Sequence, residues 1–253
     1  MTTVTTAPEA EYWLQTGQME EPGAELGIRK PVTVDRKTNL HEHRAYWCVR
    51  RAQDIFFSLL ALIALSPLML LTCIAVWIDS PGASPVFSQL RVGRNGKLFR
   101  LYKFRSMCPN AESKLNDLLQ DNEMDGPVFK MKDDPRITRV GHFIRKTSID
   151  ELPQFINVLR GDMSIVGPRP HMLQHTEQYS KLINKYMVRH LIKPGITGWA
   201  QVTGYRGETH SLSQMEGRVR RDIWYLENWS LLLDIRIIFM TVWNALRQDE
   251  NAY

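Results

Sequence analysis

Two adjacent carboxylates, Asp150 and Glu151, lie in a segment that also supplies fixed cations. Arg145 precedes them by a few residues, and Arg169 follows them. A carboxylate can attack phosphorus as a nucleophile, while nearby cations neutralise the charge on the phosphoryl oxygens. This set of residue types is what phosphoryl transfer through an aspartyl phosphate requires. Asp-Glu dipeptides are also common at protein surfaces, so the pair alone is weak evidence.

Neighbouring carboxylates repel each other unless positive charge separates them. Mg²⁺ usually takes one or two protein carboxylates and completes its shell with water and substrate phosphates. Asp150 and Glu151 could therefore divide the work, one attacking phosphorus and the other holding the metal. A histidine metal site is disfavoured, because His171 and His175 lack the rest of an HExxH motif.

The residues around the pair predict a helix N-terminus. Ser148 and Glu151 have the spacing of a capping box, which would give Glu151 a purely structural role. If Asp150 is the N-cap instead, Pro153 falls in the first turn, where its missing N–H costs little. Both alternatives place Asp150 at a helix N-terminus, where the helix dipole favours anions.

Pro168, Arg169 and Pro170 form a short segment with little backbone freedom. Such a segment would present the guanidinium of Arg169 in a fixed direction, which suits bidentate binding of a phosphate. A purely structural loop is the alternative.

The elements that must position these residues include a membrane segment. Residues 55–78 carry no charged side chain, and about 20 helical residues span a bilayer. Proline in the pair Ser66-Pro67 disrupts a helix near the middle of the run. Both flanks are basic, and basic flanks stay in the cytoplasm. We therefore favour a re-entrant helix-break-helix over a full span, with a buried core helix as the weaker third alternative.

A β-hairpin is predicted next, with strands at 86–92 and 97–104 joined around Asn95-Gly96. Six cations and no acid occur from 91 to 105, namely Arg91, Arg94, Lys97, Arg100, Lys103 and Arg105. They could form a solvated basic surface or a surface that contacts lipid headgroups or a pyrophosphate. Their density beside the membrane segment favours the contact surface.

The remaining sequence predicts an α+β, mainly helical chain. Residues 1–45 form a mobile arm, 46–80 the re-entrant membrane helix, and 81–253 a cytosolic catalytic domain. Helices are expected at 111–123 and 179–193, the second with an apolar face and with Arg189 on its basic face. The stretch 223–246 is interrupted by charges, and its aromatic residues could lie at headgroup level or in the core.

Composition agrees with a folded protein that meets anionic partners. The 253 residues carry a net charge of +5, and the three cysteines form no CxxC pair, which fits a reducing compartment. A nucleic-acid binder is disfavoured by the membrane segment and by the lack of a recognised binding motif. A membrane-docked scaffold protein that binds anionic lipid remains an alternative to an enzyme.

Several long motifs in register resemble the bacterial sugar transferase family, the monotopic polyprenyl-phosphate phosphoglycosyl transferases. The resemblance covers about 47–253 and rests on SPVFSQLRVGRNGKLFRLYKFRSM, DDPRITRVGHFIRKTSIDELPQFINVLRGDMSIVGPRP, KPGITGWAQVTGYRGET and YLENWSLLLDIRIIFMTVWNA. It implies a monotopic protein of the bacterial inner membrane with interfacial amphipathic helices and an active site on the cytosolic face. It also implies a helix broken at Ser66-Pro67.

The resemblance further implies a role for each site residue. Asp150 would attack the β-phosphate of a UDP-sugar, release UMP and pass the phosphosugar to undecaprenyl phosphate, while Glu151 would hold Mg²⁺. The candidates for phosphate or nucleotide binding are Lys103, Arg105, Arg145, Arg169 and its flanking Pro168 and Pro170, with Asp162 and Asp222 in supporting roles.

The last third of the chain is similar to the subgroup that acts on UDP-glucose in exopolysaccharide synthesis, so glucose 1-phosphate is the expected cargo. Long members of that subgroup carry additional N-terminal membrane helices, and we expect their contribution here to be absent or supplied in trans. The sequence leaves the oligomeric state open, a homodimer included.

Overall fold

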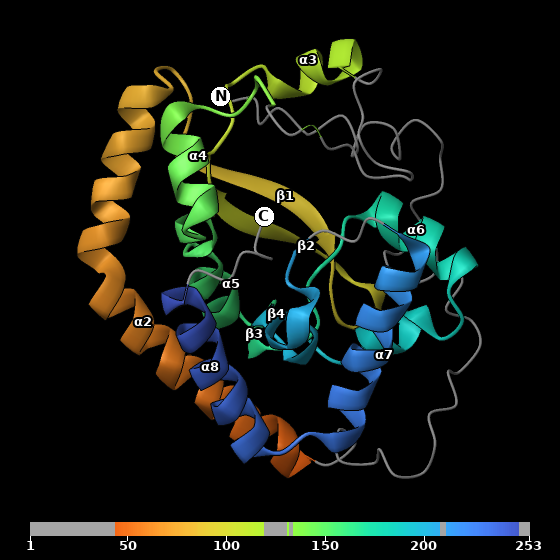
Figure 1. The fold of residues 1–253 in the computed structure, drawn as a ribbon. Coiled ribbons are helices and arrows are strands. Elements are labelled where there is room, and N and C mark those ends of the chain that lie inside the picture. The colour runs from red at the N-terminus through yellow and green to blue at the C-terminus, as the bar shows by residue number, and fades with distance from the viewer. Residues whose placement is uncertain (1–43, 119–130, 132–133, 208–210, 248–253) are drawn as a thin grey trace.

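The computed structural model describes residues 44–118, 131, 134–207 and 211–247, which are mainly helical with two small two-stranded sheets (Figure 1). The predicted mobile arm lies outside these residues except for its last two positions. The elements are α2 (Arg44–Asp79), β1 (Val86–Val92), η2 (Arg94–Gly96), β2 (Leu98–Phe104), α3 (Ala111–Leu118), α4 (Arg139–Lys146), η4 (Ile149–Glu151), α5 (Gln154–Arg160), β3 (Ser164–Val166), α6 (Leu173–Leu182), η5 (Tyr186–Leu191), β4 (Gly195–Thr197), η6 (Gln201–Tyr205), α7 (Leu212–Asn228) and α8 (Leu231–Leu246).

The apolar segment forms one element, the 36-residue helix α2, which runs through Ser66 and Pro67. Pro67 has no N–H to donate, and the Ser66 hydroxyl donates to the carbonyl of Ile63 at 2.8 Å. The ribbon of α2 changes direction along its length instead of separating into two helices (Figure 1). A proline removes one hydrogen bond and leaves the flanking turns intact, so a bend replaces the predicted break.

Among the described residues, α2 is the one helix long and apolar enough to cross a membrane by length and composition. Only 11% of its most apolar window is buried, which contradicts the core-helix alternative. Its large side chains are exposed over most of its length, at Ile55, Phe56, Leu59, Leu60, Ile63, Leu68, Leu70, Leu71, Ile74, Trp77 and Ile78.

The first turns of α2 are bound to the small parallel sheet. Arg50 and Asp54 are almost fully buried there. The Asp54 carboxylate accepts hydrogen bonds from the Ser164 hydroxyl at 2.8 Å and from the Ile165 N–H at 2.9 Å, and Arg50 donates to the carbonyl of Val166. These polar contacts fix the start of α2 against β3.

The last turns of α2 are bound to the helix that precedes the carboxylate pair. The Asp79 carboxylate accepts a hydrogen bond at 3.0 Å from the N–H of Val140, in the first turn of α4. Val76 is buried in an apolar cluster with Phe104 and Ile144. Both ends of α2 are therefore attached to the same folded body.

The hairpin prediction is confirmed. β1 and β2 pair in antiparallel register from Val86 opposite Phe104 to Val92 opposite Leu98. Asn95 and Gly96 adopt φ of 56° and 78°, which asparagine and glycine tolerate best.

Asn157 of α5 ties the backbone of the hairpin to the centre of the fold. Its amide donates to the Arg100 carbonyl at 2.7 Å and accepts from the Tyr102 N–H at 2.9 Å. Asn157 is fully buried, so these bonds replace the water that its amide would otherwise bind. These two hydrogen bonds fix the position of β2 along the axis of α5.

The parallel pair β3–β4 lies in the main core, with Ser164 opposite Gly195 and Val166 opposite Thr197. A Cβ atom at Gly195 would lie 2.1 Å from the backbone N of Gly167, so only glycine lets the segment after β3 approach this closely. This close approach sets the path of the chain into the following Pro-Arg-Pro segment.

The predicted continuous helix over 179–193 is wrong. α6 ends at Leu182, and Lys185 takes φ of 62° before the 3₁₀ helix η5. A left-handed residue interrupts helical hydrogen bonding, which periodicity alone does not reveal. Arg189, predicted on a polar face, is only 2% exposed.

Some of the C-terminal aromatic residues serve as core anchors, and a position of the others at headgroup level stays a prediction. Trp224 and Trp243 are exposed. Tyr225 is buried and donates through its hydroxyl to Asp234 at 2.5 Å, and the Trp229 indole donates to the same carboxylate at 2.9 Å. The predicted helix at 111–123 is observed over 111–118, and its last positions lie outside the described residues.

Candidate active site

The carboxylate pair lies in η4, a single 3₁₀ turn between α4 and α5. Ser148 precedes the turn in a left-handed conformation and makes no side-chain capping bond, so the capping-box alternative is wrong. Pro153 stands at the N-cap of α5, where its missing N–H is not needed. Both carboxylates are therefore presented just before a helix start.

Glu151 binds two cations from separate segments. Arg169 approaches its carboxylate with both terminal nitrogens, at 2.6 Å and 3.3 Å. Lys103, on β2, lies 3.1 Å from the Oε1 atom. Burial alone would raise the pKa of Glu151, but Arg169 and Lys103 together hold that pKa well below its ordinary range. Glu151 is therefore ionised at neutral pH.

Asp150 has a different environment one residue earlier. It is 7% exposed, and its Oδ2 atom lies 3.6 Å from the Lys103 amine. Its buried Oδ1 atom has no hydrogen-bond partner among the described residues. Burial raises the pKa of Asp150, Lys103 lowers it, and the charge of Glu151 raises it again. Asp150 is thus the more basic carboxylate and the one with an oxygen left to react.

Arg145 and Arg105 lie at different distances from this centre. Arg145, in the last turn of α4, is close enough to lower the pKa of Asp150. Arg105 follows β2, and its guanidinium donates to the Ser84 carbonyl at 2.8 Å and lies over the Phe87 ring. Arg145 therefore contributes to the electrostatic environment of Asp150, whereas Arg105 contacts residues at the open end of the hairpin.

Asp162 is at the opposite end of α5 from the carboxylate pair. It lies 3.6 Å from Arg160 and accepts a long hydrogen bond, 3.3 Å, from the Asn157 amide. No contact joins it to the carboxylate pair within the described ranges. Its position suits support of the hairpin, and its predicted supporting role at the site remains a prediction.

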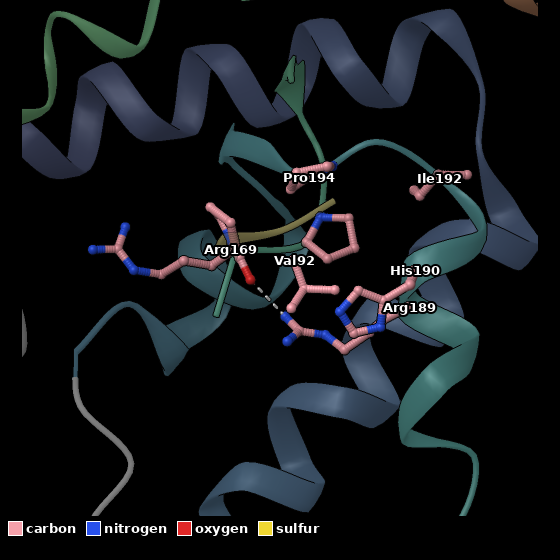
Figure 2. Close-up of a pocket in the computed structure, with 8 residues that line it drawn as sticks. Val92, Arg169, Arg189, His190, Ile192 and Pro194 are labelled. Carbon is pink, nitrogen blue, oxygen red and sulfur yellow. Dashed lines mark hydrogen bonds between the residues drawn. The ribbon is translucent and has the colours of Figure 1, made fainter. Parts of the chain in front are cut away.

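Asp222, from α7, acts on the site through Arg189. The two side chains form a buried ion pair at 2.8 Å, and Arg189 also donates to the backbone carbonyl of Arg169 at 2.9 Å. Figure 2 shows the Arg189 guanidinium directed at that carbonyl, while the Arg169 side chain points away from it. The ion pair thus fixes the backbone from which Arg169 reaches Glu151.

The same segment is held at its flanking positions. The Pro168 carbonyl accepts from the Gly195 N–H at 2.9 Å, and Pro168 and Pro170 line a small pocket with Arg189. His171, which follows, lies 2.8 Å from Arg189 through Nδ1. Burial and the charge of Arg189 lower the pKa of His171 well below its ordinary value, so its ring is neutral and accepts this bond.

Sequence reasoning missed Arg189 and Arg206. The spacing of Arg189 matches that of nearby lysines and predicts a polar face, whereas a break in the helix turns Arg189 inward. Arg206 follows η6 and donates to the Ser148 hydroxyl at 2.9 Å, beside the carboxylate turn. The only sequence feature pointing to Arg206 was its place within a long family motif.

A divalent cation would find two carboxylates here. The described residues contain no group of three or more potential metal-ligating side chains. The unpartnered Oδ1 of Asp150 and the adjacent Glu151 nevertheless fit Mg²⁺, which accepts one or two protein carboxylates and takes its remaining ligands from water and substrate phosphates.

Comparison with known proteins gives a family and several relatives. The family described as bacterial sugar transferase matches residues 45–248. Two proteins called UDP-glucose:undecaprenyl-phosphate glucose-1-phosphate transferase are 49% identical to this chain. The protein from Escherichia coli (strain K12) matches over 78% of this chain and 40% of its own length, and that from Xanthomonas campestris pv. campestris over 94% and 46%.

The chain spans less than half the length of these two relatives. A shorter relative, the exopolysaccharide production protein PSS of Rhizobium leguminosarum bv. phaseoli, is 44% identical over 80% of this chain and 97% of its own length. The match therefore includes one relative that consists almost entirely of the region shared with this chain.

We predict that Arg189→Met destabilises the protein by about 3–5 kcal/mol, because it leaves Asp222 buried and unpaired. The double variant Arg189→Met with Asp222→Leu should recover much of that loss, since no uncompensated charge remains. Denaturant unfolding in detergent micelles measures both.

Arg220→Met is the matched control, since it breaks the exposed Arg220–Glu216 pair on the same helix and should cost at most about 1 kcal/mol. Equal losses in the two single variants would contradict a structural role for the buried pair.

Proposed function

The chain belongs to the bacterial sugar transferase family, and on that basis we propose that it transfers a sugar 1-phosphate from a UDP-sugar to undecaprenyl phosphate. The observation that carries this proposal is the buried Asp150, which has one unpartnered oxygen and sits between Lys103 and Glu151. A nucleophile needs a free lone pair, and this carboxylate keeps one in surroundings rich in positive charge.

In the first step, an Asp150 oxygen attacks the β-phosphorus of the UDP-sugar. The bond between that phosphorus and the oxygen bridging to the α-phosphate breaks, and UMP leaves with the bonding electrons. The product on the protein is a phosphosugar-aspartate. Lys103 and Arg145 supply positive charge beside the oxygens that become more negative in the transition state.

In the second step, a phosphate oxygen of undecaprenyl phosphate attacks the same phosphorus. The bond to Asp150 breaks, the carboxylate is restored, and the sugar leaves as a lipid diphosphosugar. Arg169 is fixed on a rigid backbone and already binds a carboxylate with two nitrogens. That fork geometry matches two phosphate oxygens equally well, so Arg169 is suited to bind a substrate phosphate.

Mg²⁺ is the proposed cofactor, held by Glu151 with substrate phosphates completing its shell. When bound, it would neutralise charge on the phosphoryl oxygens and favour departure of UMP. Glu151 suits this role because Arg169 and Lys103 lower its pKa, which favours the ionised form that binds a cation. Its contacts with Lys103 and Arg169 would rearrange to admit the cation.

Glucose 1-phosphate is the proposed cargo. Two relatives at 49% identity are named for UDP-glucose, and the chain matches one of them over 94% of its residues. The product would be a lipid-linked glucose that starts an exopolysaccharide or another surface glycan.

The proposed location is the bacterial inner membrane, with the active site on its cytosolic face and α2 re-entrant. Arg50 and Asp54 at the start of α2, and Asp79 at its end, all bind one folded body. If α2 crossed the bilayer, that body would have to lie on both sides at once. A bent helix that enters and leaves by one face removes this conflict, and Pro67 supports the bend.

We predict that purified protein with Mg²⁺ and undecaprenyl phosphate releases UMP from UDP-glucose, and that Asp150→Asn abolishes release while the protein stays folded. The amide is a much poorer nucleophile of nearly the same size. Glu227→Gln, an exposed carboxylate-to-amide change on α7, should retain full release. UMP release by Asp150→Asn at the wild-type rate would remove Asp150 from the reaction and favour a scaffold protein that binds anionic lipid.

The acidic limb of the pH–rate profile should report Asp150, since only its ionised form attacks. Activity falls as pH drops through the pKa of Asp150, which burial raises. Lys103→Met removes a charge that lowers this pKa, so the limb should move to higher pH. Glu151→Gln removes a charge that raises it, so the limb should move to lower pH.

These opposite shifts are measured on the residual UMP release of each variant. Lys97→Met, an exposed lysine at the hairpin turn, should leave the limb in place. Shifts in the same direction for Lys103→Met and Glu151→Gln would show that the limb belongs to another group.

The re-entrant arrangement predicts that both ends of α2 are labelled from one side of the membrane. Cys48 is exposed near the start, and Pro81→Cys places a thiol just after the end. Each would be the single cysteine in its variant, with the other cysteines changed to alanine. A membrane-impermeant maleimide should label both in inside-out vesicles and neither in right-side-out vesicles. Labelling from opposite sides would show that α2 spans the bilayer.

A further inference from the structure

A second group of cations lies away from the carboxylate pair, at the start of α2. It consists of Arg51 on α2, Arg94 in the hairpin turn and Lys193 just before β4. These residues are far apart in the sequence; Arg51 and Lys193 meet beside Gly161, where α5 ends, and Arg94 lies close enough to Lys193 to lower its pKa. Asp150 precedes the other end of α5, so the two cationic regions are separated by the length of that helix.

Gly161 lies between two of these cations. Its φ of 90° favours glycine, and a Cβ atom there would lie 3.5 Å from the Lys193 amine and 3.8 Å from the Arg51 guanidinium carbon. The two positive groups therefore converge on one place from which a side chain is missing.

Nearby carboxylates and carbonyls balance only part of the positive charge beside Gly161. Burial raises the pKa of Asp54 and of Asp234, and the nearby charge of Arg50 opposes that rise in both. Arg51 donates to the carbonyls of Val158 and Leu159, both at 2.6 Å, which are negative ends of the α5 dipole.

Lys193 lacks such a partner. Its amine makes no hydrogen bond or ion pair within the described part of the chain. Burial and then Arg51 lower the pKa of Lys193, Asp54 raises it, and Arg94 lowers it further. A half-buried amine surrounded mainly by other cations would gain most from an added anion.

The location of the cluster identifies the anion. Arg94 stacks on the ring of Trp47, 3.8 Å from its centroid, and tryptophan is enriched at the headgroup level of bilayers. The exposed apolar face of α2 begins two turns later with Ile55 and Phe56. The cations therefore lie where the headgroups meet the segment that would enter the bilayer.

We propose that Lys193 and Arg94 bind the phosphate of an anionic phospholipid, with its acyl chains along the apolar face of α2. This proposal rests on the insertion of α2 in a membrane and is independent of the transfer chemistry. A lipid held there would brace the hairpin turn against the segment before β4, because one phosphate would bridge Arg94 and Lys193.

The test is titration of the delipidated full chain in detergent with phosphatidylglycerol or phosphatidylcholine, with bound lipid counted by native mass spectrometry. The wild type should retain phosphatidylglycerol in preference to phosphatidylcholine. Lys193→Gln should weaken phosphatidylglycerol binding roughly fivefold, the contribution of one cation at a lipid surface. Lys193→Arg keeps the charge and should retain the preference.

Lys181→Gln is the matched control, because it removes an exposed lysine on α6 and should leave binding unchanged. Unfolding curves of each variant separate loss of a lipid contact from loss of the fold. Equal weakening by Lys181→Gln, or an unchanged preference in folded Lys193→Gln, would overturn the proposal. Glycerol 3-phosphate that competes as well as the lipid would also overturn it, since the site would then bind a free phosphate.

Discussion

The contact between Glu151 and the Arg169–Lys103 pair is the interaction on which the rest of the site depends. It joins three segments that are distant in the sequence, namely the 3₁₀ turn, the Pro-Arg-Pro segment and the second strand of the hairpin. Glu151 binds both cations directly, whereas burial of Asp150 is less fully offset, so the pKa of Glu151 is lowered and that of Asp150 is raised. Two chemically similar carboxylates thereby acquire different properties.

Two of these segments are fixed by buried polar groups that lie behind them. Arg189 and Asp222 fix the backbone of Arg169, and Asn157 fixes the strand that carries Lys103. Such groups contribute little net stability, because removing them from water costs nearly as much as their contacts return. They do restrict the chain to one arrangement, since any alternative would leave a buried charge or amide without a partner.

Prediction from the sequence is most accurate where a few adjacent residues determine the backbone conformation. Asn95-Gly96 predicts the hairpin because the turn needs residues that accept positive φ, and both do so here. It fails for Arg189, because a periodic pattern cannot reveal that Lys185 turns left-handed and reverses the face on which Arg189 lies. For Glu151 only the capping alternative fails, because its partners come from segments that are remote in the sequence.

The two attachments of α2 affect the order in which the protein can be assembled. A ribosome delivers α2 first, before β3 and α4, to which its ends bind. The partners of the Asp54 carboxylate and of the last turn of α2 are therefore synthesised after α2 itself. The 3₁₀ turn that carries Asp150 packs over Val76 through Ile149 and Leu152. The carboxylate pair can therefore reach its observed position only after α2, β2 and α4 have all been made.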